Sequence, residues 1–255
     1  MEAFAGIDVA FAKKKHLPIS ICVRRGGTLE PLLLRKESLV PPSGHGNAKS
    51  LDYEIVMDFA ESTAKYLHDV ERVCGVRIRR IAIDAPSDPK SNGSPRREAE
   101  KGLDERGISC FTTPDTVQFN SIRAKAQAHL ISRGEESRLP HANQLWMLVG
   151  FELFRRLRKE WECLEVFPQA IAKKLGAAGI HKSRVEGLIC QLSAAARFTG
   201  WPKAEYKSSL KDIGYGSVHD KLDAYLAAWV ASLDIEDREA IGILPDDVIW
   251  VPRIR

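Results

Sequence analysis

The stretch Phe4-Ala5-Gly6-Ile7-Asp8-Val9-Ala10 decides how the rest of the chain can be arranged. It is an apolar run of the length of a buried β-strand, and it carries one carboxylate, Asp8, among its apolar residues. Taking an ionised carboxylate out of water costs several kcal/mol unless a positive charge or hydrogen-bond donors meet it. We therefore expect the fold to supply a metal ion, a basic side chain or donor groups to Asp8.

Two other segments also attach carboxylates to apolar runs. The run Ile81-Ala82-Ile83-Asp84-Ala85-Pro86 has Asp84 shortly before the proline that stops the strand. The segment Asp220-Lys221-Leu222-Asp223 opens an alanine-rich helix, and its two acids share one helix face because they are three residues apart. Asp223 lies on the stripe expected to pack on the sheet. We interpret the three segments as converging on one acidic cluster that holds divalent metal.

Each acid also has an ordinary structural explanation. Asp8 can accept hydrogen bonds from a turn or a lysine, and Asp84 can be the residue before a turn. Asp220 at the N-cap and Asp223 at N3 resemble a capping box and complement the helix dipole. The joint occurrence favours a metal site, because a mixed sheet can bring two strand ends and one helix together. Oxygen ligands without matching Cys or His select Mg²⁺ or Mn²⁺ over zinc.

Five apolar runs predict the strands of one sheet, separated by turns and helices. The expected strands are residues 4–11, 17–23, 29–34, 78–84 and 163–167, the first three forming an antiparallel meander. Glu165 lies inside the fifth run, as Asp8 and Asp84 lie in the first and fourth. The expected helices are residues 52–73, 96–106, 115–133, 143–159, 168–175, 182–198 and one starting near Asp220, with a short strand at 108–112. Residues 86–160 read as a mostly helical insertion in a single α/β domain spanning 1–255.

Composition and cysteine use narrow the class of protein. The chain has 255 residues and a formal net charge of +4, so its surface tolerates a polyanion but lacks a dense basic stripe. Its five cysteines are scattered singly, without Cys-x-x-Cys spacing, and predict reduced thiols rather than a zinc site. The sequence shows neither a signal-peptide pattern nor a run of about 20 apolar residues. We expect a soluble, cytoplasmic protein without membrane association.

The order of these elements and five short motifs carry a family resemblance. Three antiparallel strands, a helix and two more strands, with acids on the first and fourth strands and on an Asp-x-x-Asp helix, resemble the ribonuclease H fold, and most of all its RuvC branch. The motifs are Gly6-Ile7-Asp8-Val9-Ala10, Ala82-Ile83-Asp84-Ala85-Pro86, Glu165-Val166-Phe167-Pro168, Leu222-Asp223-Ala224 and Ile249-Trp250-Val251-Pro252. Together they resemble a widespread prokaryotic family of unassigned function, described as predicted ribonuclease H-like nucleases. The resemblance spans nearly the whole chain and implies a ribonuclease H-like mixed five-stranded sheet flanked by helices, with the helical insertion between strands four and five.

The resemblance also implies a function and roles for the acids. According to this resemblance, Asp8 and Asp84 match the first two acids of the nuclease cluster. Asp223 and Asp220 match its helical pair, and Glu165 matches a glutamate that recurs in the family. We therefore expect a metal-dependent nuclease that hydrolyses phosphodiester bonds of nucleic acid, DNA or RNA, with Mg²⁺ or Mn²⁺. Asp8 would bridge two ions, and Asp84 and Asp223 would each hold one. Asp220 or Glu165 would complete a ligand shell or orient water.

Two other functions stay open at this stage. A phosphoryl-transfer or nucleotide-binding protein of the sugar-kinase and actin type has a related sheet and an Asp on its first strand. It normally carries a Gly and a Ser or Thr just after that Asp, which Val9-Ala10-Phe11-Ala12 lacks. The second alternative is a non-catalytic nucleic-acid-binding module on the same fold, whose acids would be open or neutralised by internal Lys and Arg.

Several basic and aromatic residues have more than one interpretation. Arg96 and Arg97 could steer phosphates toward the acids, but solvated surface arginines are the favoured explanation. Lys182 could also steer phosphates toward the acids, although the sequence gives this role less support. The helix at residues 145–157, with its aromatic side chains, is expected to pack in the core or to form the contact of a homodimer.

Overall fold

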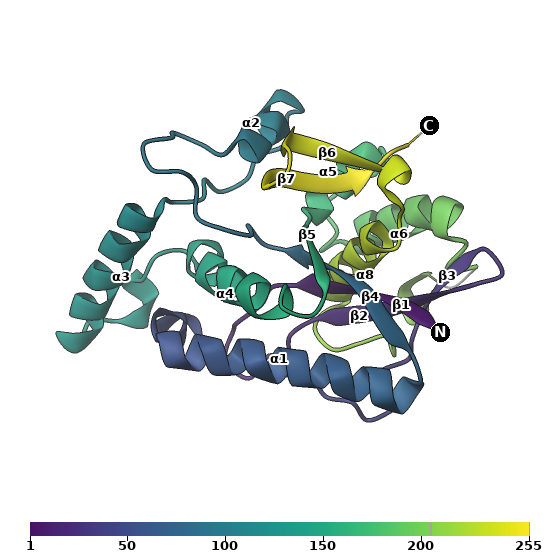
Figure 1. The fold of residues 1–255 in the computed structure, drawn as a ribbon, viewed down its shortest axis with the longest axis horizontal. Coiled ribbons are helices and arrows are strands. Elements are labelled where there is room, and N and C mark those ends of the chain that lie inside the picture. Colours follow the sequence, from purple (N-terminus) through teal and green to yellow (C-terminus); the bar gives the residue numbers. More distant parts are fainter. Residues whose placement is uncertain (204–205, 255) are drawn as a thin grey trace.

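The computed structural model describes residues 1–203 and 206–254. In this part of the chain, a five-stranded mixed sheet and a two-stranded ribbon combine with helices into an α/β fold (Figure 1). The sheet has the spatial order β3-β2-β1-β4-β5. Its strands are β1 (Glu2–Asp8), β2 (Ile19–Arg25), β3 (Thr28–Pro31), β4 (Arg77–Asp84) and β5 (Glu162–Glu165).

Helices connect the strands, and the ribbon follows the last helix. The α-helices are α1 (Tyr53–Cys74), α2 (Glu98–Glu105), α3 (Thr116–Ile131), α4 (Ala142–Leu157), α5 (Pro168–Lys174), α6 (Val185–Thr199), α7 (Tyr206–Ser209) and α8 (Val218–Ala231). Short 3₁₀ helices are η1 (Asn47–Leu51), η2 (Glu136–Arg138) and η3 (Ile235–Asp237), and the ribbon is β6 (Arg238–Ile243) with β7 (Asp247–Pro252). Among the described helices, none combines the length and apolar character that crossing a membrane requires.

Strand direction brings two of the acids to the same edge of the sheet. β1 pairs antiparallel with β2 but parallel with β4, and β4 pairs parallel with β5. In the register between β1 and β4, Asp8 lies directly opposite Asp84. Both are the last residues of their strands, so two carboxylates meet at the carboxyl end of the parallel strands, the place where open α/β sheets bind ligands.

The two faces of the sheet are covered by different helices. Ile7 belongs to the core cluster formed with α1 and α4, whereas Phe4 and Ala82 belong to the cluster formed with α5, α6, α8 and the ribbon. Because side chains alternate along a strand, Asp8 shares the face of Phe4 and Asp84 that of Ala82. Both acids therefore point to the side of α8. In Figure 1, α1 runs along the lower edge of the view and the β6–β7 ribbon lies at the upper edge.

Helix α8 lies directly on the backbone of β1 at Gly6. A Cβ atom added to Gly6 would stand 2.0 Å from the carbonyl oxygen of Ala224 and 2.3 Å from the nitrogen of Ala228. Alanines on the facing side of α8 permit this approach, and Ala224, Ala227 and Ala228 are all buried. Asp223 precedes this contact by one residue, so the close packing sets its distance from the strand ends.

Two expected elements differ from the structure, and one strand of the structure was not expected. Residues 108–112 form no strand, and the Thr113 backbone N–H that follows them donates to Glu100 Oε1 (2.7 Å), so a side chain satisfies this backbone group instead of a neighbouring strand. The strand β6 was not expected; it pairs antiparallel with β7, which the sequence shows only as an apolar run. The helix expected from residue 182 begins at Val185, which leaves Lys182 in the preceding segment.

We predict that Gly6→Ala unfolds or strongly destabilises the protein, because no flexible side chain can yield to the added methyl group. Overpacking costs typically about 1–3 kcal/mol, and a clash with helix backbone belongs at or above the upper end of that range. Urea unfolding measures the difference. The control is Gly179→Ala, where an added Cβ meets nothing within 4 Å. Equal stability of the two variants would contradict the packing of α8 on β1.

Candidate metal centre

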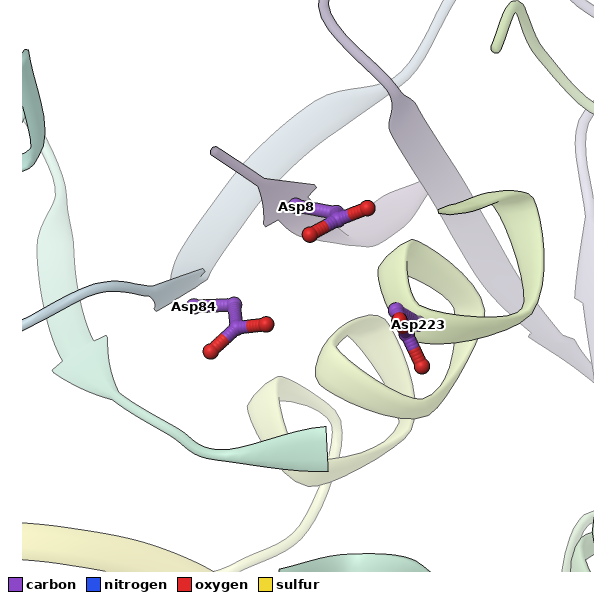
Figure 2. A group of neighbouring side chains, drawn as sticks. All are labelled: Asp8, Asp84 and Asp223. Atoms are coloured by element: carbon purple, nitrogen blue, oxygen red, sulfur yellow. The ribbon is translucent and has the colours of Figure 1, made fainter. Parts of the chain in front are cut away.

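Three acids from distant parts of the chain form one cluster. Asp8, Asp84 and Asp223 each offer a carboxylate oxygen, and these three oxygens all lie within 4.8 Å of one another. Figure 2 shows the side chains approaching one another from two strand ends and from the second turn of α8. Asp223 is only 4% exposed, whereas the other two retain some contact with solvent. The structure thus brings together the three acids from the separate segments singled out in the sequence.

The cluster holds more negative charge than its surroundings stabilise. Burial, followed by the charges of Asp223 and Asp84, raises the pKa of Asp8 well above its ordinary value. Burial and the charge of Asp223 raise the pKa of Asp84 to about 8. Burial also raises the pKa of Asp223, although a neighbouring lysine opposes this shift. Carboxylates with raised pKa values in close contact need a cation before all of them can ionise at neutral pH.

Lys182 supplies part of that positive charge. Its ammonium group contacts Asp223 Oδ2, and the pull of Asp223, Asp8 and Asp84 raises its pKa in spite of burial, which acts in the opposite direction. The other oxygen, Asp223 Oδ1, is buried without a hydrogen-bond partner among the described residues. An orphaned carboxylate oxygen costs free energy unless a ligand satisfies it. One ammonium facing three carboxylates leaves an excess of negative charge, and the donor set of oxygens fits a hard divalent cation.

Asp220 lies close to the cluster but has a different role. Helix α8 begins at Val218 with Ser217 as its N-cap, so the expectation that Asp220 is the N-cap and Asp223 is N3 is wrong. Asp220 is the N3 residue of a capping box: its Oδ2 accepts from the Ser217 backbone N–H (3.0 Å), and its Oδ1 lies 2.8 Å from His219 Nδ1. Its charge contributes to the raised pKa values of Asp8 and Asp223. The oxygens that form the cluster therefore do not include those of Asp220.

Glu165 lies beside the cluster but is not one of the three acids that form it. It pairs with Ile83 in the register of β4 and β5, and its charge contributes to the raised pKa of Asp84. Arg97 donates from its two terminal nitrogens to the two carboxylate oxygens, both at 2.8 Å, and the Ser87 backbone N–H also donates to Glu165 (2.8 Å). These bonds engage both carboxylate oxygens and hold Glu165 beside the cluster.

The expectation that Arg97 is a solvated surface arginine is wrong. Its side chain is 5% exposed, and it also pairs with Asp247 at the start of β7 (3.0 Å). The buried pair with Glu165 spans 68 residues of sequence, and no local pattern around either residue relates them. Sequence analysis could have recognised only that Glu165, an acid inside an apolar strand, needed a basic partner.

A cavity of about 240 Å³ adjoins the acids. Asp8, Asp84 and Glu165 form part of its wall, and aromatic side chains of the segment before α3 and of α4 form another part. The cluster can therefore be reached by a ligand larger than a metal ion, and the surfaces next to it are both charged and apolar.

Fold and site define an α/β protein whose mixed sheet carries a cluster of three carboxylates, two of them at the ends of the adjacent strands β1 and β4. The chain belongs to the family described as protein of unknown function (DUF429), whose model matches residues 47–248. The matched region includes Asp84, Glu165 and Asp223 but begins after β1, which carries Asp8. No curated protein and no solved structure matches the chain.

The first prediction from this site concerns pH in the absence of metal. The folded-state pKa of Asp84, about 8, lies above its ordinary value near 3.8, so the native state retains a proton that the unfolded state releases. The contribution of Asp84 to the free energy of unfolding must then decrease as pH rises from about 4 to about 8. Urea unfolding in a chelating buffer at pH 6 and pH 9 measures this decrease. Asp84→Asn should reduce the pH dependence, whereas Asp58→Asn, an exposed acid on α1, should leave it unchanged.

The second prediction concerns the buried ion pair. Arg97→Met leaves the carboxylate of Glu165 buried without its partner and should lower the free energy of unfolding by about 3–5 kcal/mol. The control is Arg158→Met, which breaks the exposed pair between Arg158 and Asp88 (2.9 Å) and should cost at most about 1 kcal/mol. Losses of similar size in the two variants would show that the Arg97 pair is not buried as described.

Proposed function

We propose that this protein is a divalent-metal-dependent nuclease that hydrolyses phosphodiester bonds of nucleic acid. The supporting observation is the cluster of Asp8, Asp84 and Asp223, in which one buried oxygen of Asp223 has no partner among the described residues. Oxygen ligands of this kind suit Mg²⁺ or Mn²⁺. Bound divalent ions supply an activated water and stabilise the leaving oxygen in phosphodiester hydrolysis.

We further propose that residues 1–255 form a single domain of ribonuclease H-like, RuvC-like architecture. Support comes from the element order, with antiparallel β1, β2 and β3, then α1, then β4 and β5 parallel to β1. The placement of acids at the ends of β1 and β4 and on the late helix α8 fits the same resemblance. Fold alone does not define an activity, so the proposal depends on the site and not on this likeness.

The acids of the proposed site are positioned by different parts of the fold. Asp8 and Asp84 come from adjacent parallel strands with a fixed register, so their spacing is set by the sheet itself. Asp223 comes from α8, whose separation from β1 is set by the contact at Gly6. Lys182 balances part of the charge of Asp223 and leaves the second oxygen of that carboxylate free for another ligand. Asp220 holds the start of α8 through its bond to Ser217 and thereby positions Asp223.

The contact of Lys182 also favours a second candidate, a non-catalytic nucleic-acid-binding module. In such a module an internal lysine would substitute for the metal, and the cluster would have no need of a cation. Metal titration separates the two functions: the nuclease requires Mn²⁺ binding that Asp223→Asn removes, whereas the binding module shows none. Stabilisation by a nucleotide without metal-dependent cleavage would instead favour a protein of the sugar-kinase and actin type.

The proposed activity makes a direct prediction for Asp8. Asp8→Asn keeps the size of the side chain but removes the charge shared with Asp84 and Asp223, and it should reduce cleavage on the order of 10²–10³-fold, the scale for losing one group that stabilises transition-state charge. The assay uses single-stranded and structured DNA and RNA with Mg²⁺ or Mn²⁺. Asp58→Asn, an exposed acid on α1, is the matched control and should cleave like the wild type. Wild-type behaviour of Asp8→Asn on every substrate would contradict catalysis by this cluster.

A further inference from the structure

We propose that the cavity beside the acidic cluster is a subsite for one unpaired nucleobase, so that the substrate unit is a nucleotide outside a duplex. This subsite rests on the proposed function, because the carboxylate part of its wall is the part that would meet the phosphate through bound metal. The cavity of about 240 Å³ is slightly smaller than most pockets that hold drug-sized organic ligands, whose volumes begin at roughly 300 Å³. A single flat ring suits that volume better than a base pair.

The wall of the cavity combines two kinds of chemistry. Asp8 and Asp84 provide carboxylate oxygens, while Phe111, Trp146 and Met147 provide aromatic and apolar surface. A ligand that uses both parts must carry an anionic, metal-binding group next to a flat apolar group. A nucleotide has this construction, since its phosphate and its base are joined through one sugar.

Phe111 offers an open aromatic face. Its side chain is 49% exposed and lies in a segment without helix or strand. A large part of this apolar ring therefore faces solvent. His141, the N-cap of α4, stacks against it with ring centroids 5.0 Å apart and an angle of 23° between the planes. The imidazole supports one part of the ring surface, and a base can stack on the rest. Stacking on an aromatic side chain accepts every base, because each base has a π-face.

The first turn of α4 adds a fixed ring and a polar group. Trp146 Nε1 donates to Asn47 Oδ1 (3.0 Å), which fixes the plane of the indole. Asn143 lies three residues earlier, on the same side of the helix, and also lines the cavity. No described residue hydrogen-bonds to the Asn143 side chain, so its amide can donate to and accept from the edge of a base.

The arrangement selects an unpaired base. In a duplex, neighbouring bases cover both faces of a base and the complementary strand occupies its pairing edge, so an enzyme that needs these surfaces must use a single strand or a base turned out of the stack. Both the stacking surface of Phe111 and the amide of Asn143 require such a base. Loops and single strands therefore fit the cavity, whereas a continuous duplex does not.

Binding of three probes tests the subsite. The probes are a 5′-mononucleotide, a phosphorothioate-linked single strand that resists cleavage, and the same strand annealed to its complement, each titrated in the presence of Mn²⁺. We expect the wild type to bind the single strand at least about tenfold more tightly than the duplex. Phe111→Ala and Phe111→Leu should both weaken single-strand binding by about tenfold, the scale for losing one base–aromatic stack. Tyr53→Ala removes another aromatic ring with 49% exposure, outside the cavity, and should bind like the wild type.

The outcomes separate this subsite from the nuclease proposal. Equal affinity for single strand and duplex, or wild-type binding by both Phe111 variants in folded protein, overturns the subsite. Recovery of full affinity in Phe111→Leu also overturns it, since apolar contact without a ring would then be sufficient. Mononucleotide binding as tight as that of the single strand supports the base subsite and assigns it to free nucleotides. If binding depends on Phe111 but the wild type cleaves no substrate, the nuclease activity is overturned and the subsite is supported. If the wild type cleaves nucleic acid and neither binding nor cleavage depends on Phe111, the nuclease activity is supported and the subsite is overturned.

Discussion

The contact between Gly6 and helix α8 is the constraint on which the site depends. The helix backbone approaches the strand so closely that no side chain fits between them, and buried alanines on the helix continue the contact. Ordinary helix–sheet packing would separate Asp223 from the strand ends by the thickness of a layer of side chains. Here that layer is missing, and the carboxylate of a helix residue comes within 4.8 Å of carboxylates from two strands.

Concentrating like charges in this way costs stability, so the fold must hold the acids in place by other means. The register of β1 and β4 sets Asp8 opposite Asp84, and neither can move without shifting an entire buried strand. Asp223 is held by the packing of α8 and by the capping box at its start. Burial and mutual repulsion raise the pKa of each acid, and they also make the site attractive to a cation. The same forces that destabilise the cluster by itself would thus favour a bound cation.

The sequence predicted the main sheet and three acids of the site, because these depend on local patterns. Apolar runs located the five strands, and carboxylates at the ends of two of them had to lie near each other once the strands paired in parallel. Glu165 was grouped with them and does line the cavity beside Asp8 and Asp84, but the strand pattern does not show that Arg97 pairs with its carboxylate. The partner of Glu165, Arg97, was missed because a pair 68 residues apart leaves no trace in spacing. The N-cap of α8 was placed at Asp220 instead of Ser217, since both residue types are good N-caps and tertiary contacts decide between them.

The two cations near the sheet edge differ in what holds them, and this difference bears on how the site is used. Arg97 is buried and joins β5 to the start of β7 through its ion pairs with Glu165 and Asp247, so it stabilises one wall of the cavity. Lys182 lies in the segment before α6, whose neighbours His181 and Ser183 are exposed, and it contacts the acid cluster through a single flexible side chain. In the proposed nuclease, a divalent ion at the cluster would compete with Lys182 for Asp223 and would leave the Arg97 pair intact. Under that proposal, metal binding would change the charge balance at Asp223 without disturbing the cavity wall beside it, as a site that holds both a metal and a substrate requires.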